Sequence, residues 1–142
     1  SRPRRARPAA PLDPRVARVI ARLQAEHAAL NARHFGGALA RVEIRLSAPM
    51  RSRLGHYSPA QGGAPPHIAI GRRHLRRHGW EAVRETLLHE MVHQWQDENG
   101  LPLDHRARFK AKAREVGLPP TAAAPAGPRS LRAALQSFLR RG

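Results

Sequence analysis

The sequence predicts an α+β fold, and the order of its hydrophobic patterns carries that prediction. A long segment with helical periodicity comes first, three short strand-like segments follow, and two further helical segments come after them. A chain of 142 residues suits one domain with one hydrophobic core. We therefore expect an N-terminal helix, a small, mostly antiparallel three-stranded sheet, and two helices after the sheet.

The N-terminal helix is expected to begin at Asp13-Pro14, because Asp is a good N-cap and Pro suits the first helical position. The pair Gly36-Gly37 is expected to end this helix. Between them, side chains on one helical face recur every three or four residues: Val16, Ile20, Leu23, His27, Leu30 and His34.

Three short strands are expected in the middle of the chain. Apolar and charged residues alternate between residues 38 and 48, which is the period-two pattern of a half-buried strand. A shorter strand is expected over residues 53–57, and a third over residues 67–70, after a loop rich in Pro and Gly. Because the connections are brief, the strands are expected to pair in a mostly antiparallel sheet.

Helical segments follow the strands. Residues 72–78 predict a short helix or turn, and Trp80 to Asn99 predict a long helix that Gly100 ends. Asp104 is the expected cap of a further helix, which runs to about Val116 and turns its apolar side chains inward.

The two ends of the chain differ in composition from its middle. Residues 1–11 hold four Arg and three Pro without periodicity, which predicts a disordered basic arm. The folded domain is expected over residues 12–118. Residues 119–142 are expected to form a linker and an amphipathic helix that packs on the domain, with a partner-binding tail as the alternative.

The composition excludes several classes of site. The sequence has no cysteine, so disulfides, a cysteine nucleophile and cysteine-held metals are ruled out, and a metal must be held by His and carboxylate side chains. No stretch approaches the ~20 consecutive apolar residues of a membrane-spanning helix, so no membrane partner is expected. No export signal is recognised, which predicts a cytoplasmic location, and we expect a monomer.

The charge is strongly positive, at +16, and 24 of the 26 basic residues are Arg. The planar guanidinium binds two phosphate oxygens at once, and such an excess of positive charge is typical of proteins that bind polyanions. The sequence therefore predicts contact with DNA or RNA, with a general compositional bias toward Arg, Ala and Pro as the alternative. Two clusters are the candidates for this contact: Arg2, Arg4, Arg5 and Arg7, and Arg72, Arg73, Arg76 and Arg77.

The segment His89-Glu90-Met91-Val92-His93 carries the chemistry. Residues four apart on a helix share a face, so two imidazoles can bind one ion. Zn²⁺ accepts neutral imidazole and keeps one open position in catalytic sites. Glu90 follows the first imidazole, where a general base must lie to take a proton from water activated at the metal. The sequence therefore predicts one Zn²⁺ per chain.

A tetrahedral site needs a third protein ligand. The downstream candidates are Asp97, Glu98, Asp104 and His105. Asp97 shares the helix face of His93. However, a third ligand further along a straight helix lies too far from a tetrahedral ion. His105 follows the turn after Gly100, and a chain that turns back can present it from the opposite side, so we prefer His105.

These residues resemble the SprT-like zinc metalloprotease family, which includes Spartan. Family members have a similar HExxH helix and then a His-Gly-x-x-Phe motif, and the resemblance covers about residues 14–118. It rests on Thr86 to His93 and His105 to Lys110, with further similarity at Asn31, Phe35 to Leu39, Gly55 to Tyr57, and His67 to Ile70. Arg106 stands where the family usually has Gly, and the Cys-rich zinc ribbon of many relatives has no counterpart here.

The resemblance implies a minimal gluzincin-like domain, with His89, His93 and His105 as zinc ligands and Glu90 as catalytic base. Family members cleave proteins, and the eukaryotic ones digest proteins crosslinked to DNA. The expected function is therefore a zinc metalloendopeptidase whose protein substrates are associated with nucleic acid. Two alternatives stay open: a nucleic-acid-binding module with a structural or inactive zinc site, and a zinc hydrolase of another substrate class.

Other polar side chains have less specific interpretations. Tyr57 is a candidate to stabilise the oxyanion of peptide hydrolysis, but it fits better as a strand aromatic. Four histidines could contact the metal ligands or phosphate, although exposure to solvent is the more ordinary expectation: His56, His67, His74 and His78.

Overall fold

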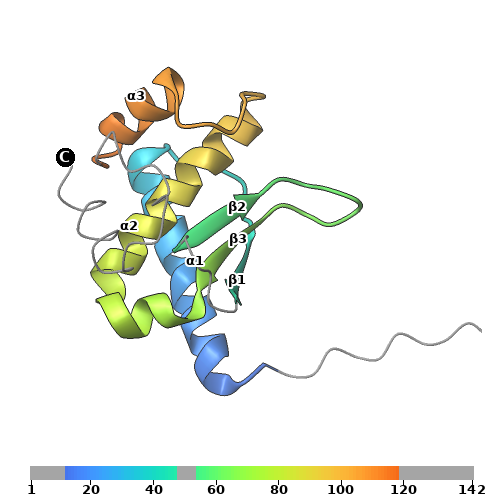
Figure 1. Cartoon of the computed structure of the whole chain (residues 1–142), viewed down its shortest axis with the longest axis vertical. Helices are drawn as coiled ribbons and strands as arrows, with labels where there is room; N and C mark the ends of the chain where they lie inside the picture. Colours follow the sequence, from blue (N-terminus) through green and yellow to red (C-terminus); the bar gives the residue numbers. More distant parts are fainter. Residues whose placement is uncertain (1–11, 48–53, 119–142) are drawn as a thin grey trace, which may run out of the picture.

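The computed structural model describes residues 12–47 and 54–118, and it has the predicted α+β architecture (Figure 1). The expected basic arm at residues 1–11 and the expected C-terminal segment at residues 119–142 lie outside the described part. The elements follow in the order α1 (Pro14–His34), β1 (Glu43–Ser47), β2 (Gly55–Ser58), β3 (His67–Gly71), α2 (Arg72–Glu98) and α3 (Ala107–Glu115).

Helix α1 begins as its sequence predicts. The Asp13 side chain caps it by accepting a hydrogen bond from the Arg15 amide at 2.8 Å, and Pro14 takes the first helical position. Three residues of the predicted face are buried in the helix: Leu23, His27 and Leu30. In the last turn of the helix, the Asn31 side chain bonds both backbone groups of Leu39, so the segment before β1 is held as a loop rather than as a strand.

The sheet is mixed, which corrects the expectation of a mostly antiparallel one. Its strand order is β1-β3-β2; β2 pairs antiparallel with β3, whereas β1 pairs parallel with β3. Short connections suggested successive hairpins, but only β2 and β3 form one. Strand β3 takes the centre because its Ile68 and Ile70 are almost fully buried, and β1 then pairs with its other edge.

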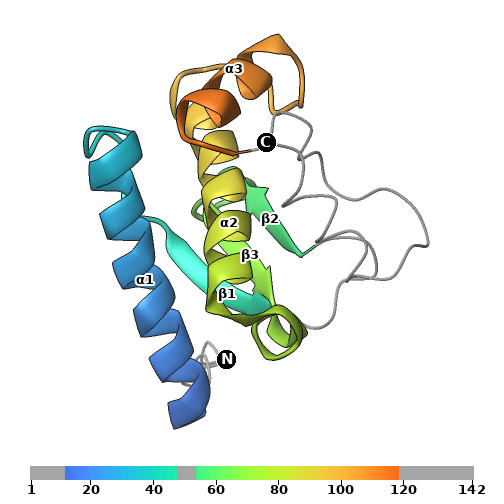
Figure 2. The same cartoon turned by 90° about the vertical axis from the view of Figure 1, so that its left-hand side faces the viewer.

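Helix α2 is the central element of the domain. It packs against β2, β3, α1 and α3, while α1 covers β1, so both long helices lie on one side of the sheet (Figure 2). Gly79 interrupts it with a non-helical backbone at φ 83° and ψ 173°. The predicted short helix over residues 72–78 and the predicted long helix are therefore both present, joined across a kink.

Helix α3 differs from its expected start. Asp104 does not cap it; the helix begins at Ala107, and Asp104 accepts a hydrogen bond from the Arg106 amide inside the preceding turn. Arg106 has φ −86°, so this turn does not need the glycine that is usual in the SprT-like family. As predicted, Phe109, Ala113 and Val116 are buried.

Among the described residues, no helix combines the length and the apolar character needed to cross a bilayer.

Candidate metal centre

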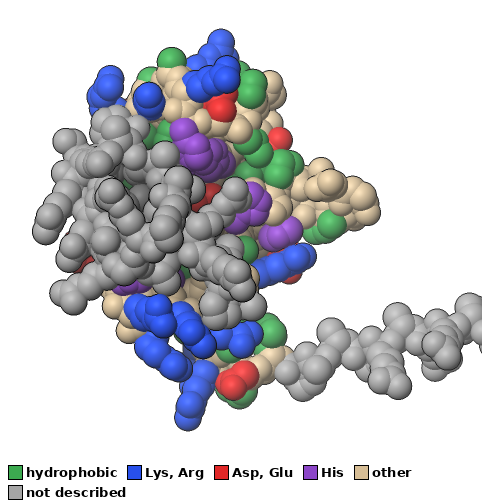
Figure 3. Space-filling view, in the orientation of Figure 1, with side chains coloured by type: hydrophobic (Ala, Val, Ile, Leu, Met, Phe, Trp, Pro, Cys, Tyr) green, Lys and Arg blue, Asp and Glu red, His purple; other side chains and the backbone are tan. Residues whose placement is uncertain are grey.

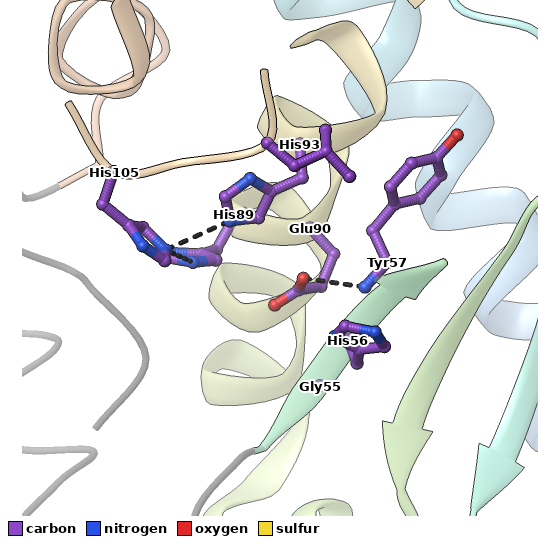
Figure 4. A pocket seen from close by; sticks show the side chains of 8 residues that line it. Gly55, His56, Tyr57, His89, Glu90, His93 and His105 are labelled. Atoms are coloured by element: carbon purple, nitrogen blue, oxygen red, sulfur yellow. Dashed lines mark hydrogen bonds between the residues drawn. The ribbon is translucent and has the colours of Figure 1, made fainter. Parts of the chain in front are cut away.

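Three imidazoles meet in a cavity beside α2. His89 and His93 lie one turn apart on the helix, and His105 reaches them from the loop before α3 (Figure 4). The His105 Nε2 atom lies 3.1 Å from His93 Nε2 and 3.4 Å from His89 Nε2. Within the described part of the chain, these three residues form a group that could hold a metal ion. The structure thus brings together the three ligands that the sequence suggested.

The spacing of these nitrogens fits zinc. Zn²⁺ binds imidazole nitrogen at about 2.0–2.1 Å, and tetrahedral geometry then separates two ligand nitrogens by about 3.3–3.4 Å. The observed separations of 3.1 and 3.4 Å lie close to that value. Three imidazole nitrogens also suit a borderline-soft ion better than Mg²⁺ or Ca²⁺, which prefer oxygen.

The protonation state of His89 and His93 also favours metal binding. Burial lowers the pKa of His89 well below its ordinary value, with His93 and His105 adding to the effect. Burial likewise lowers the pKa of His93 to about 4, although its hydrogen bond to Gln96 acts in the opposite direction. Both imidazoles are therefore neutral at pH 7, which is the form that binds a metal.

A helix C-cap turns the chain so that His105 can reach the other two imidazoles. Gly100 takes a left-handed backbone at φ 68°, as expected for the residue after a helix. Its amide bonds the Asp97 carbonyl at 3.0 Å, and the Leu101 amide bonds the Gln96 carbonyl at 2.8 Å, which together form a Schellman motif. This motif closes α2 and reverses the chain.

The three carboxylates considered as alternatives to His105 accept hydrogen bonds from other groups. Asp97 accepts a hydrogen bond from the Tyr57 hydroxyl at 2.6 Å. Glu98 accepts from the Ala40 amide and from the Gln94 side chain. Asp104 accepts from the Arg106 amide. None of the three belongs to the described cluster of possible ligands.

Phe109 forms the common wall behind the imidazoles. It is fully buried, and its ring centroid lies 5.0, 4.8 and 4.7 Å from those of His89, His93 and His105. The His93 ring stacks on it, whereas the His105 ring meets it edge-on. One side chain of α3 therefore fixes the planes of all three rings.

Glu90 lies in the same cavity and is anchored by a strand. It is only 6% exposed, and its Oε1 accepts a hydrogen bond from the Tyr57 amide of β2 at 3.0 Å (Figure 4). The cavity has a volume of about 160 Å³. Its lining consists of Gly55, His56, Tyr57, His89, Glu90, His93, Leu103 and His105.

Gly55 permits this anchoring. A Cβ atom at Gly55 would lie 2.8 Å from Thr86 Cγ2, closer than packed atoms tolerate, and a tight 3.3 Å from Glu90 Cγ. The missing side chain therefore lets β2 approach α2 closely enough for the Tyr57 amide to reach Glu90.

Tyr57 does not fit the role of oxyanion donor. Its side chain is buried, and its hydroxyl donates to Asp97 and points away from the imidazoles (Figure 4). Burial, together with Asp97, raises the pKa of Tyr57, so the hydroxyl stays protonated. Tyr57 is therefore a buried strand aromatic, which is the interpretation that the sequence favoured.

The four remaining candidate histidines differ in exposure, and two of them, His67 and His78, are half-buried. His56 is exposed and lines the cavity. His74 is buried, contrary to the expectation of solvent exposure, and its ring bonds His78 at 2.9 Å and the Thr86 hydroxyl at 2.8 Å. Burial lowers the pKa of His74 to about 4, so this ring is a neutral packing element of the bend at Gly79.

The second arginine cluster lies apart from the cavity. Arg72, Arg73, Arg76 and Arg77 are all exposed, and none of them is among the residues that line the cavity. Figure 3 shows Lys and Arg side chains gathered at the lower end of the molecule, where α1 and α2 begin. The Arg2 to Arg7 cluster lies outside the described residues.

Sequence reasoning missed several supporting residues. Gln96, which bonds His93, lies three residues after it, so helical spacing alone could have singled it out. The Tyr57 amide left no signal, because every residue except proline carries the same group. The need for Gly55 depends on how closely β2 and α2 pack, which no local pattern encodes.

Two imidazoles on one helix, a third imidazole beside them and a small α+β domain define a candidate metallopeptidase. The SprT-like family matches this chain over residues 23–126, so the chain belongs to that family. No curated protein and no solved structure gave a significant match. Membership and the histidine cluster together support a metalloprotease-like domain that could hold a metal.

The third ligand can be tested by metal binding. We expect the purified chain to bind about one equivalent of zinc, measured by competition with a chromogenic chelator. His105→Ala should weaken zinc binding by more than the ~10–100-fold typical of losing an outer-shell partner. Asp97→Ala is the control and should keep the wild-type affinity. The reverse pattern would show that Asp97 is the ligand.

The close approach at Gly55 can be tested by overpacking. Gly55→Ala should lower the free energy of unfolding by about 1–3 kcal/mol, because the new methyl group collides with Thr86. Thr86→Ser removes only the colliding methyl and keeps the hydroxyl that bonds His74. In the double variant, chemical denaturation should therefore show a smaller destabilisation than in Gly55→Ala alone. Simple additivity of the two effects would contradict the packing argument.

Proposed function

We propose that this chain is a zinc-dependent metalloendopeptidase, with Glu90 as general base. One observation carries the proposal: the Glu90 carboxylate lies in the same cavity as the three convergent imidazoles. A structural zinc site gains nothing from a buried carboxylate held beside the metal position. This argues against a nucleic-acid-binding module with a purely structural site.

The roles of the residues follow from their positions. His89, His93 and His105 would hold one Zn²⁺. When bound, zinc polarises the scissile carbonyl and lowers the pKa of the attacking water. Glu90 takes the proton from that water and passes it to the leaving amine. The Tyr57 amide fixes the orientation of the carboxylate, so that no reorganisation is needed when the proton moves.

The size of the cavity favours a polypeptide over a small enclosed substrate. Pockets that enclose small molecules commonly have volumes of about 300–1,000 Å³. This cavity, at about 160 Å³, has room for the reacting peptide group and little more. The rest of the substrate would then lie outside, as an extended chain crossing the opening. This favours a peptidase over a zinc hydrolase of another substrate class.

The base can be tested separately from the metal site. Glu90→Gln should bind zinc with near wild-type affinity and should cleave an unfolded protein at least about 100-fold more slowly, because the amide cannot accept the proton. Cleavage would be followed on a denatured substrate by gel electrophoresis, with zinc content measured on the same samples. Undiminished turnover in this variant would exclude Glu90 as the base.

We further propose that the protein substrates are associated with DNA or RNA, as in the repair of DNA–protein crosslinks. The support is the second arginine cluster, which is exposed on one segment of α2. Among the described residues, no carboxylate forms an ion pair with these four side chains. We also propose that the protein is cytoplasmic and monomeric.

The nucleic-acid contact can be tested by its salt dependence. Replacing Arg72, Arg73, Arg76 and Arg77 by Gln should weaken duplex binding, because fewer phosphates are then neutralised. The slope of log K against log salt should become shallower by about 0.9 for each phosphate that the variant leaves without a cation. Fluorescence anisotropy across a salt series measures both quantities. Zinc content should not change.

A second quadruple variant separates position from net charge. Replacing Arg33, Arg41, Arg108 and Arg114, which are also exposed, removes the same charge from scattered positions. It should change the slope less than the clustered variant does. Equal effects, or a wild-type slope near zero, would remove the cluster as a specific nucleic-acid contact.

A further inference from the structure

Gln96 links the two segments that carry the three imidazoles. It lies on α2 and is 1% exposed. Its Oε1 atom lies 2.8 Å from His93 Nδ1, and its Nε2 atom lies 3.2 Å from the backbone carbonyl oxygen of Asp104. Since Asp104 directly precedes His105, one buried amide connects the second imidazole to the loop that carries the third.

The chemistry of these partners fixes the orientation of the amide. A backbone carbonyl can only accept a hydrogen bond, so the Gln96 NH₂ group must face Asp104. The Gln96 oxygen then faces His93 Nδ1. Because that oxygen can only accept, Nδ1 must carry the proton.

The orientation of the amide decides the tautomer of His93. With the proton on Nδ1, the neutral ring has its lone pair on Nε2, which is the atom that lies 3.1 Å from His105 Nε2. A histidine in water prefers the opposite tautomer, with the proton on Nε2. In that tautomer the proton occupies the atom that would have to bind the metal. The Gln96 contact therefore works against the preference of the isolated side chain.

We propose that Gln96 is the positioning residue of this centre. It selects the metal-binding tautomer of His93 in the metal-free protein, and it sets the position of the His105 loop through Asp104. The second part of this inference rests on the proposed zinc site. The first part concerns the metal-free chain and can be tested even if no zinc binds.

Gln94 provides a matched control on the same helix. It is also fully buried, but its amide bonds His27 Nε2, the Ala40 carbonyl and Glu98 instead of the imidazole cluster. Replacing Gln94 removes a buried amide of the same size and leaves the His93 contact in place. The Gln94 variant therefore measures only the loss of stability that follows from removing a buried amide.

The tautomer can be read by ¹⁵N nuclear magnetic resonance of metal-free protein labelled at histidine, at pH 7.5. The signal of His93 is assigned from its disappearance in His93→Ala. In the wild type and in Gln94→Leu, we expect His93 with the proton on Nδ1. In Gln96→Leu, we expect a shift of population toward the proton on Nε2. Gln96→Glu should restore the wild-type tautomer, because a carboxylate also accepts from Nδ1.

Zinc affinity tests the second part. Gln96→Leu should bind zinc about 10–100-fold more weakly than the wild type, as is typical when the outer partner of a ligand is removed. Gln94→Leu should lower the melting temperature and leave zinc affinity unchanged. Gln96→Glu should bind more weakly than the wild type despite its correct tautomer, because a carboxylate cannot donate to the Asp104 carbonyl.

The outcomes that would overturn the inference are distinct. A wild-type His93 with its proton on Nε2 would overturn the tautomer assignment, and this result does not depend on whether the Gln96 variants fold. Wild-type zinc affinity in a folded Gln96→Leu, or an equal weakening in Gln94→Leu, would overturn the positioning role. If the wild type binds no zinc while the expected tautomer is found, the proposed function fails and the tautomer assignment stands.

Discussion

The burial of polar side chains in the middle of α2 is the constraint on which the candidate site depends. His89, Glu90 and Gln96 are each no more than 6% exposed. A buried polar group without a partner costs about 1–3 kcal/mol, so neighbouring elements must supply partners. Strand β2 supplies the Tyr57 amide, and the loop before α3 supplies a carbonyl. Satisfying these groups fixes the geometry of the site at the same time.

The mixed sheet explains why β2 lies beside α2. Strand β3 is the most buried of the three strands and separates β1 from β2. Strand β1 is covered by α1, and β2 is left at the other edge, against α2. Within the described ranges, no further strand pairs with the outer edge of β2, so the Tyr57 amide of this strand can bond the Glu90 side chain of α2.

Local patterns predicted the parts of the structure that depend on local chemistry. The cap at Asp13, the turn at Gly100 and the spacing of His89 and His93 each follow from a few neighbouring residues, and all are present. The parallel pairing of β1 depends on competition among strands that are distant in sequence. The burial of His74 depends on the bend at Gly79, which brings its ring against Thr86. Neither could be inferred from periodicity, because periodicity describes one element at a time.

The kink at Gly79 has a consequence for the direction in which the arginines point. In an uninterrupted helix, at about 100° per residue, the mean direction of the four arginines from Arg72 to Arg77 would lie roughly 150° away from that of His89 and His93. Gly79 breaks that angular relation with a backbone at φ 83°. Figure 3 shows His side chains and Lys and Arg side chains on one face of the molecule. The direction of the arginines relative to the histidine cluster is thus set here by the backbone torsions of one glycine instead of by the helical period.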